Sequence, residues 1–246
     1  MCKLLRRVFR SQEFQWPVEL DDYEKSIIDE VVGNNLTMTG RRRMVALAMA
    51  VRYLVKNRIP GDFVECGVWR GGASIVAQKL FTYHGDLDRR FFMYDTFAGM
   101  TEPADVDREA STDTLAIDLK PKPDSSGVGW CECSIEDVKK NIVDQGADLS
   151  SFVFVKGDIC ETLLETVPER CALLRLDTDW YESTKLEMEI LYPKLVLGGV
   201  LHVDDYGHWQ GARKAVDEYF SKPERSEIPL FSVVDESCRS AVKRTA

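Results

Sequence analysis

The fold of this chain is decided by one stretch, Phe63-Val64-Glu65-Cys66-Gly67-Val68-Trp69-Arg70-Gly71-Gly72-Ala73-Ser74. A short apolar run leads into Glu65, three glycines follow, and apolar residues with helical spacing continue from Ala73 to Phe81. This order predicts a β-strand, a glycine-rich turn and an α-helix. Glycines in such a turn let the backbone approach a ligand beside the N-terminus of the helix, where nucleotide-like ligands bind.

The rest of the chain repeats this alternation of β-like runs and helical stretches. Because the two kinds of segment alternate, we expect an α/β fold with a doubly wound, mostly parallel sheet. The predicted strands are 63–66, 91–94, 152–155, 173–176, 200–203 and 230–234, and the predicted helices are 73–81, 135–145, 184–191 and 211–220.

Two helical segments precede the first predicted strand. Apolar residues with helical spacing occupy 20–35 and 40–57, before Pro60-Gly61 ends the pattern. We therefore expect residues 1–60 to form an N-terminal helical cap or arm, and residues 61–246 to form a single structural domain. Residues 101–130 are rich in Asp, Pro, Ser and Gly and are expected to form a surface loop or mobile flap inside that domain.

Composition and charge narrow the class of partner. The 246 residues carry a formal net charge of −9, whereas a sequence-independent nucleic-acid binder needs concentrated Lys and Arg. No stretch is long enough to span a bilayer, and the basic first ten residues are expected either to touch a membrane surface or to form a frayed or subunit-contacting arm. No secretory apolar segment follows that basic start, so we expect a cytoplasmic protein whose seven cysteines are reduced.

The glycine turn separates two classes of nucleotide cofactor. A dinucleotide site requires G-x-G-x-x-G, and Trp69 stands where its second glycine belongs, which disfavours NAD and FAD. S-adenosylmethionine has no pyrophosphate, so the looser turn with Gly67 and Gly71 can serve it. Asp95 closes the next predicted strand, where an acid can accept hydrogen bonds from both ribose hydroxyls. Asp158 ends the third, as an acceptor for an adenine amino group or as a solvated turn residue.

Acidic residues follow two further predicted strands. The run 173–176 leads into Asp177-Thr178-Asp179, and the run 200–203 leads into Asp204-Asp205. The ends of neighbouring parallel strands lie together, and gathered carboxylates repel one another unless a cation or good donors offset them. Oxygen ligands favour magnesium or calcium. Helix capping by Asp179 and Asp205 is the alternative, but caps account for fewer acids than the four present.

Polar and aromatic residues come directly after the second acidic pair. Tyr206, His208 and Trp209 lie on a predicted loop and are candidates to bind a substrate, with bracing of the loop as the alternative for His208. Aromatic rings at such positions stack on a sugar or an adenine, and they also pack as ordinary core residues.

These motifs together resemble one known family. Over residues 36–220 the chain is similar to the macrocin O-methyltransferase (TylF-like) family. The resemblance implies a class I methyltransferase fold, S-adenosylmethionine and Mg²⁺ as cofactors, and methyl transfer to a sugar hydroxyl of a glycosylated natural product or glycan. It also implies a homodimer or a larger homo-oligomer. The stretches that carry it are Leu36-Thr37-Met38-Thr39, Gly61-Asp62-Phe63-Val64-Glu65-Cys66-Gly67-Val68-Trp69-Arg70-Gly71-Gly72, Asp95-Thr96-Phe97-Ala98-Gly99-Met100 and Asp204-Asp205-Tyr206-Gly207-His208-Trp209.

The resemblance also implies a role for each group of residues. It makes Asp179 the general base for the acceptor hydroxyl. Because Asp177 and Asp179 are two residues apart, an extended chain points both to the same side, and the pair can divide ligand and base roles. The implied metal ligands are Asp177, Asp204 and Asp205, and the implied cofactor contacts are Met38, Thr39, Glu65 and Asp95, to which the turn adds Gly67, Gly71 and Ser74.

Two other functions stay open on the sequence. One is an O-methyltransferase for catechol-like phenols, which uses a similar metal on vicinal hydroxyls. The other is a non-catalytic homologue that keeps the fold and binds the cofactor. The identity of the acceptor separates the first from a sugar methyltransferase, and the response to loss of Asp179 separates the second.

Overall fold

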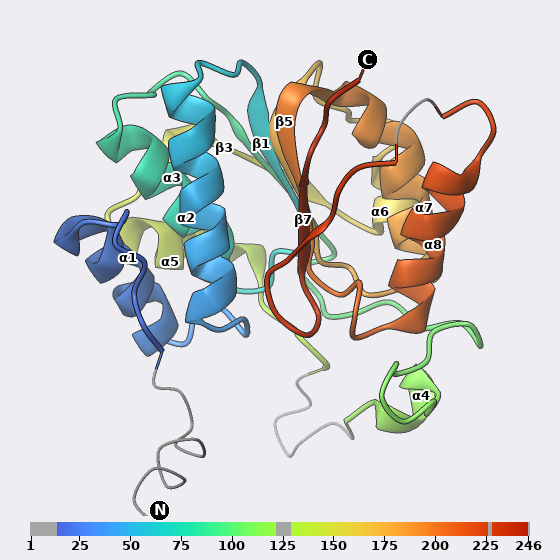
Figure 1. Ribbon diagram of the computed structural model, residues 1–246. Helices are drawn as coiled ribbons and strands as arrows, with labels where there is room; N and C mark the ends of the chain where they lie inside the picture. Colours follow the sequence, from blue (N-terminus) through green and yellow to red (C-terminus); the bar gives the residue numbers. More distant parts are fainter. Residues whose placement is uncertain (1–13, 122–128, 226–227, 246) are drawn as a thin grey trace, which may run out of the picture.

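A computed structural model describes residues 14–121, 129–225 and 228–245, and the basic first ten residues lie outside this part (Figure 1). Its centre is one seven-stranded sheet with the order β3-β2-β1-β4-β5-β7-β6. The pairs among β1 to β5 are parallel, and β7 is antiparallel to β5 and β6. The predicted doubly wound, mostly parallel sheet is therefore confirmed. The strands are β1 (Asp62–Cys66), β2 (Phe91–Asp95), β3 (Phe152–Lys156), β4 (Cys171–Leu176), β5 (Leu195–Val203), β6 (Ser232–Val233) and β7 (Arg239–Val242).

Helices cover both faces of this sheet (Figure 1). The α1, α2, α3 and α5 helices share one buried apolar cluster with Phe63 and Leu173 of the sheet, and α6, α7 and α8 share another with Val64 and Leu174. Successive residues of one strand thus face opposite layers, as the period of two requires. The helices are α1 (Asp22–Gly33), α2 (Arg41–Lys56), α3 (Gly72–Tyr83), α4 (Ala116–Leu119), α5 (Ile135–Asp144), α6 (Ile159–Thr162), α7 (Tyr181–Ile190) and α8 (Gln210–Ser221).

The strand β4 lies at the centre of the sheet, and this position explains why its residues are almost all apolar. All its residues are buried, because helices cover it from both sides. Arg175 is the one charged residue in the strand, and its side chain is only 4% exposed. A buried guanidinium needs acidic partners, so the burial of Arg175 indicates a polar site at this end of the sheet.

The predicted N-terminal cap packs directly against the sheet layer. Its first helix, α1, begins at a capping box in which Asp21 accepts from the Glu24 N–H (3.0 Å) and Glu24 accepts from the Asp21 N–H (2.8 Å). Ile27 of α1 and Met44 of α2 belong to the same buried cluster as α3. The cap and the domain share this core, and the boundary at residue 60 stays a prediction. None of the helices in the described part is both long and apolar enough to cross a bilayer.

The C-terminal part differs from the expectation. Only Ser232–Val233 of the predicted strand 230–234 is a strand, whereas β7 is formed by residues 239–242, where no strand was expected. β7 pairs along β5 through its backbone, so its register does not depend on an apolar alternation. The short helices α4 and α6 were likewise not expected.

Candidate functional site

Two adjoining cavities lie at the carboxyl ends of the parallel strands, where open α/β sheets bind their ligands. The first cavity, of about 340 Å³, is lined by residues that follow β1, β2, β3 and β4. The second, of about 290 Å³, is lined by residues that follow β1, β4 and β5, and by the segment before α2. Residues that line both mark where the cavities meet: Met38, Trp69, Cys131, Asp177 and Asp179.

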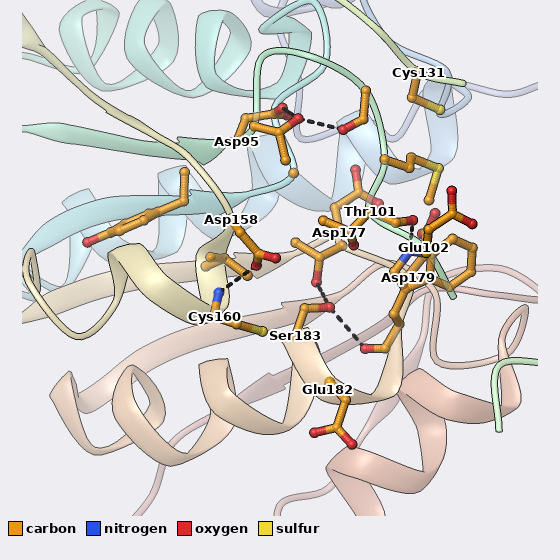
Figure 2. A pocket seen from close by; sticks show the side chains of 18 of the residues that line it. Asp95, Thr101, Glu102, Cys131, Asp158, Cys160, Asp177, Asp179, Glu182 and Ser183 are labelled. Carbon is orange, nitrogen blue, oxygen red and sulfur yellow. Dashed lines mark hydrogen bonds between the residues drawn. The ribbon is translucent and has the colours of Figure 1, made fainter. Parts of the chain in front are cut away.

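The first cavity contains two of the predicted cofactor acids. Figure 2 shows Asp95 and Asp158 on one side of it and Asp179 on the other. Asp95 accepts hydrogen bonds from the backbone N–H groups of Val68 (2.7 Å), Trp69 (3.0 Å) and Phe97 (2.7 Å), so it also fixes the glycine turn. The Thr96 hydroxyl is a fourth and longer donor to Asp95 (3.4 Å), and a ligand hydroxyl could replace this weak contact. Asp158 caps α6 by accepting from the Cys160 N–H (2.9 Å).

The glycine turn brings β1 close to β4. Gly67 has a φ of +85°, and a Cβ on it would lie 2.0 Å from the Asp177 carbonyl oxygen. The Asp177 N–H in turn donates to the Cys66 carbonyl oxygen (2.8 Å). Glycine is therefore required at position 67 for two reasons, the left-handed backbone and the approach of the next strand. This approach is what places Asp177 in both cavities.

The remaining predicted cofactor residues divide into those at the cavities and those behind them. Thr39 and the buried Glu65 line the second cavity, and the exposed Met38 lines both. Ser74 and Gly71 line neither of these two cavities. Ser74 donates its hydroxyl to Glu65, so it supports the acid from behind.

Three carboxylates converge where the cavities meet. Oxygens of Asp177, Asp179 and Asp205, called the acid group below, lie within 4.8 Å of one another. The Asp205 Oδ2 is buried and has no hydrogen-bond partner among the described residues. Burial raises the pKa of Asp179 to about 7 and raises the pKa values of Asp177 and Asp205 well above the ordinary carboxyl range. Such a group is stable when it holds protons or a cation.

Asp204 lies beside the acid group and not within it. Its Oδ1 accepts from Arg175 (2.9 Å), and its Oδ2 accepts from Arg43. Asp204 and Asp205 both line the second cavity, but the oxygens of Asp204 are paired with two arginines, whereas Asp205 joins the acid group. The predicted ligand set of Asp177, Asp204 and Asp205 is thus brought together only in part, and Asp179 takes the third place in the acid group.

Arg175 connects a predicted cofactor residue, Glu65, with the acids after β4 and β5. This role was not predicted from the sequence. Its guanidinium donates to Glu65 (2.8 Å), Asp177 (2.6 Å) and Asp204 (2.9 Å). The available signal was an arginine between Leu174 and Leu176 in a strand predicted to be buried. An arginine in that setting must be paired, and Glu65 and the acids at the strand ends were the nearby candidates in the predicted topology.

Aromatic residues close one side of the second cavity. Trp130 and Trp209 line it, and their rings pack edge to face with each other (6.4 Å between centroids) and with Trp180 (5.7 and 5.1 Å). His208 also lines this cavity and packs on Trp209. Tyr206 lines neither cavity, because its hydroxyl donates to Asp217 (2.6 Å) on α8. Trp209 and His208 are thus placed at the cavity, and Tyr206 is not.

The segment predicted as a loop or mobile flap is held by hydrogen bonds to the loops that follow β4 and β5. The buried carboxylate of Asp107 accepts from the N–H groups of Ala104 and Tyr181 (both 2.8 Å). Further on, the Ala110 N–H donates to the His208 carbonyl oxygen (2.8 Å), and the Gln210 N–H donates to the Arg108 carbonyl oxygen (2.8 Å). This segment therefore links the loop after β4 to the loop after β5, which carry the acid group between them.

Gly211 offers a test of this link. A Cβ on Gly211 would lie 1.9 Å from the Asp107 Oδ1, which bonds the first residue of α7. We expect Gly211→Ala to lower the free energy of unfolding by about 2–4 kcal/mol, because it adds overpacking and disturbs a buried carboxylate. Urea unfolding measures this change. Gly33→Ala, where a Cβ meets nothing within 4 Å, is the control, and an equal effect of both changes would contradict the prediction.

The family model for macrocin O-methyltransferase (TylF) matches residues 11–239, a range that includes both cavities and the acid group. The chain belongs to this family. The TylF family is one of enzymes, and the doubly wound fold of this member is that of the O-methyltransferase NovP. The family predicted from the sequence motifs is thereby confirmed.

Individual relatives of this TylF-family chain agree with the assignment. The 8-demethyl-8-(2,3-dimethoxy-alpha-L-rhamnosyl)-tetracenomycin-C 4'-O-methyltransferase of Streptomyces olivaceus is 35% identical over 183 residues, which are 74% of this chain and 67% of that protein. The demethyldecarbamoylnovobiocin O-methyltransferase of Streptomyces niveus is 32% identical over 203 residues, which are 82% and 71% of the two chains. The solved structure of the O-methyltransferase NovP has a TM-score of 0.77 at 26% identity and covers 91% of this chain and 98% of its own.

Proposed function

We propose that this protein transfers a methyl group from S-adenosylmethionine to a sugar hydroxyl of a glycosylated small molecule, with a bound Mg²⁺ ion. One observation carries the proposal: Asp177 and Asp179 line both cavities and converge with Asp205 where the cavities meet. A methyl donor in one cavity and an acceptor in the other would meet at these carboxylates. The names of the relatives, which include a rhamnosyl acceptor, support the choice of a sugar.

The residues around the first cavity fit the cofactor. Asp95 and Asp158 follow β2 and β3 and can accept from the ribose and adenine, respectively. Glu65 and Thr39 line the second cavity and Met38 lines both, so we propose that the methionine end of the cofactor extends past the point where the cavities meet. S-adenosylmethionine, when bound, supplies a methyl group that is already activated by the sulfonium. The task left to the protein is to align and deprotonate the acceptor.

The acid group fits a hard divalent cation. Three carboxylates offer oxygen ligands, and the Asp205 Oδ2 is buried without a partner among the described residues. We propose Asp177 and Asp205 as ligands with Asp179 within reach, and Asp204 as the neighbour that Arg175 and Arg43 hold in place. Mg²⁺, when bound, lowers the pKa of an acceptor hydroxyl and fixes its direction.

Asp179 is the proposed proton acceptor. Without a cation, burial raises its pKa to about 7; a bound Mg²⁺ would lower that pKa and would also make the acceptor hydroxyl more acidic, so a carboxylate could take the proton. Asp177 is held by Arg175 (2.6 Å), whereas no arginine contacts Asp179 among the described hydrogen bonds. Trp130, Trp209 and His208 are proposed to bind the acceptor, the indole rings by stacking and the imidazole by hydrogen bonding.

We also propose a cytoplasmic homo-oligomer. The cysteines in the described part are all free thiols, which agrees with a reducing compartment. The oligomer is inferred from the family alone.

Calorimetry followed by turnover tests the proposed function. S-adenosylmethionine is expected to bind the intact protein with and without Mg²⁺, because Asp95 and Asp158 are separate from the acid group. With Mg²⁺, glycosides are expected to yield S-adenosylhomocysteine, and excess EDTA is expected to abolish that turnover. Full activity in EDTA would contradict the cation. Turnover of catechols alone would replace the sugar with a phenol, and cofactor binding without any turnover would favour a non-catalytic homologue.

A further inference from the structure

Asp179 lies at the centre of a tight turn between β4 and α7. Its φ is 70°, and the Trp180 N–H donates to the Thr178 carbonyl oxygen (2.8 Å). A hydrogen bond between residues two apart, around a central residue with a positive φ, defines a γ-turn of the rare and strained kind. Such strain persists only where the surrounding structure holds it. The side chains behind the turn therefore decide where the Asp179 carboxylate points.

A row of buried polar side chains joins the two ends of this turn. The Thr178 hydroxyl lies 2.8 Å from the Glu187 Oε1 and 2.9 Å from the Ser183 hydroxyl. The Ser183 hydroxyl in turn donates to the Trp180 carbonyl oxygen (3.1 Å) (Figure 2). Glu187 and Ser183 both belong to α7. This helix is therefore linked to the residues on either side of Asp179.

The number of hydrogens in this row requires a proton on Glu187. A hydroxyl has one hydrogen, and Ser183 uses its own on the Trp180 carbonyl oxygen. Thr178 must then donate to Ser183, which leaves Thr178 as the acceptor from Glu187. Only a protonated carboxyl can donate a hydrogen bond. All three bonds are therefore made together only when Glu187 is neutral.

The surroundings of Glu187 favour that neutral form. Its side chain is fully buried, and its Oε2 has no hydrogen-bond partner in the described part of the chain. Burial raises the pKa of Glu187 to about 8, and no ionised side chain contributes to that shift. The titratable groups that face it are the thiols of Cys66 on β1 and Cys160 on α6, whose pKa values burial also raises. Glu187 is therefore mostly protonated at pH 7.

We propose that Glu187 is a positioning residue, which in its protonated form holds the γ-turn and so directs Asp179 to the point where the cavities meet. The inference rests on the proposed function, since it assumes that Asp179 receives the acceptor proton. Glu187 lines neither of the two cavities, whereas Thr178 and Ser183 line the first. Glu187 thus acts on the reaction through these two hydroxyls and without contact to a ligand.

Two substitutions of Glu187 separate its hydrogen bond from its volume. Glu187→Gln keeps a donor for Thr178, so it is expected to retain about half or more of the wild-type kcat at pH 7. Glu187→Met fills a similar space without a donor, so it is expected to lower kcat roughly 10- to 100-fold, the cost of a misplaced catalytic group. The KM of both variants is expected to stay within about twofold of wild type, because the cavity linings are unchanged.

The pH profile distinguishes this role from a merely structural one. Wild-type kcat at saturating Mg²⁺ is expected to fall as the pH rises above about 8, where Glu187 ionises and can no longer donate. Glu187→Gln does not ionise, so its kcat is expected to stay level over the same range.

Urea unfolding gives a second readout that needs no substrate. A carboxyl whose folded pKa is raised stabilises the folded state below its unfolded pKa, and that contribution is lost as the pH rises through the folded pKa. The urea midpoint of wild type, relative to that of Glu187→Gln, is therefore expected to fall between pH 5 and pH 9.

The hydroxyl that Glu187 contacts can be removed separately. Thr178→Val keeps the shape of the side chain and is expected to lower kcat to a similar extent as Glu187→Met. The double variant is expected to lose little more than either single variant, because both changes break the same bond. Calorimetry with Mn²⁺, a probe for an oxygen-ligated divalent site, and with S-adenosylhomocysteine reports whether the acid group and the first cavity remain intact in each variant.

Glu189, two residues further along α7, is the matched control. Its carboxylate pairs with Lys222 and Arg225, its side chain is 32% exposed, and it lines neither of the two cavities. Glu189→Gln and Glu189→Met are expected to keep the wild-type kcat and pH profile.

Three results would overturn the inference and leave the proposed function in place. They are a wild-type kcat in Glu187→Met, an equal loss of kcat in Glu187→Gln and Glu187→Met, and identical pH profiles for wild type and Glu187→Gln. If the wild-type protein bound S-adenosylhomocysteine but methylated no acceptor, the proposed function would fail and the inference with it.

Discussion

Arg175→Met is expected to lower the free energy of unfolding by about 3–5 kcal/mol, because it leaves buried carboxylates without the guanidinium that pairs with them. The guanidinium is 4% exposed and bonds Glu65, Asp177 and Asp204, of which Glu65 and Asp204 are themselves buried. Methionine has a similar length, so the loss comes from charge and hydrogen bonds more than from volume. Urea unfolding in EDTA measures the difference without interference from metal ions.

The pH dependence of the free energy of unfolding shows why Arg175→Met is less stable. Burial raises the pKa values of Glu65 and Asp177, and Arg175 lowers them in part. Without Arg175 these pKa values rise further above the unfolded carboxyl value of about 4. A carboxyl whose folded pKa is raised stabilises the folded state below its unfolded pKa, and that contribution is lost as the pH rises through the folded pKa. The loss of unfolding free energy in Arg175→Met, relative to wild type, is therefore expected to be larger at pH 8 than at pH 5.

The control for this experiment is Arg41→Met, which removes an exposed arginine from an exposed pair. It is expected to change the stability by less than about 1 kcal/mol at either pH. A deficit of Arg175→Met that is the same at pH 5 and pH 8 would mean that lost packing, and not unpaired carboxylates, destabilises the variant.

The parallel strands could be predicted because a strand that is buried on both faces requires a run of apolar residues. The run of β4 is apolar throughout except for Arg175, and β1 and β2 are also mostly buried and apolar, whereas β3 at the edge of the sheet is partly exposed. β7 obeys a different constraint. Its residues Arg239 and Ser240 are partly exposed, and the strand is set by backbone pairing with β5, for which no apolar pattern is needed. Short strands of this kind, one place in from the edge of the sheet, are hard to predict from one sequence.

The site was predictable as far as topology fixes it. Acids that follow adjacent strands must lie together, which is why Asp177, Asp179 and Asp205 meet. The side-chain direction of Asp204 was not predictable, because its carboxylate is held by Arg175 and also by a distant arginine, Arg43. That arginine is 161 residues away in sequence from Asp204 and 192 from Asp235, its second partner. Such long-range pairs follow only from the three-dimensional packing of the cap and the hairpin of β6 and β7.

Asp179→Asn is expected to lower kcat for methyl transfer by roughly 10²–10⁴-fold, the usual contribution of a general base. Asp179 has a left-handed backbone with a φ of 70°, which asparagine also tolerates, so the variant is expected to fold. Asp177 and Asp205 remain as oxygen ligands, and the Mn²⁺ affinity is therefore expected to fall by less than about tenfold. Steady-state kinetics at saturating Mg²⁺, with calorimetry for Mn²⁺, separate the two effects.

Two further variants show whether Asp179 acts as a general base or only as a metal ligand. Asp205→Asn removes the unpartnered buried oxygen, so its main effect is expected on Mn²⁺ affinity, and excess Mg²⁺ should recover much of its kcat. Asp113→Asn is the backbone control, because Asp113 also has a positive φ (59°) but lines neither cavity, and it should keep wild-type kinetics. If Asp179→Asn recovered in excess Mg²⁺ as Asp205→Asn does, Asp179 would be a ligand only. A loss that persists when the metal site is saturated requires that the carboxylate acts on the acceptor proton.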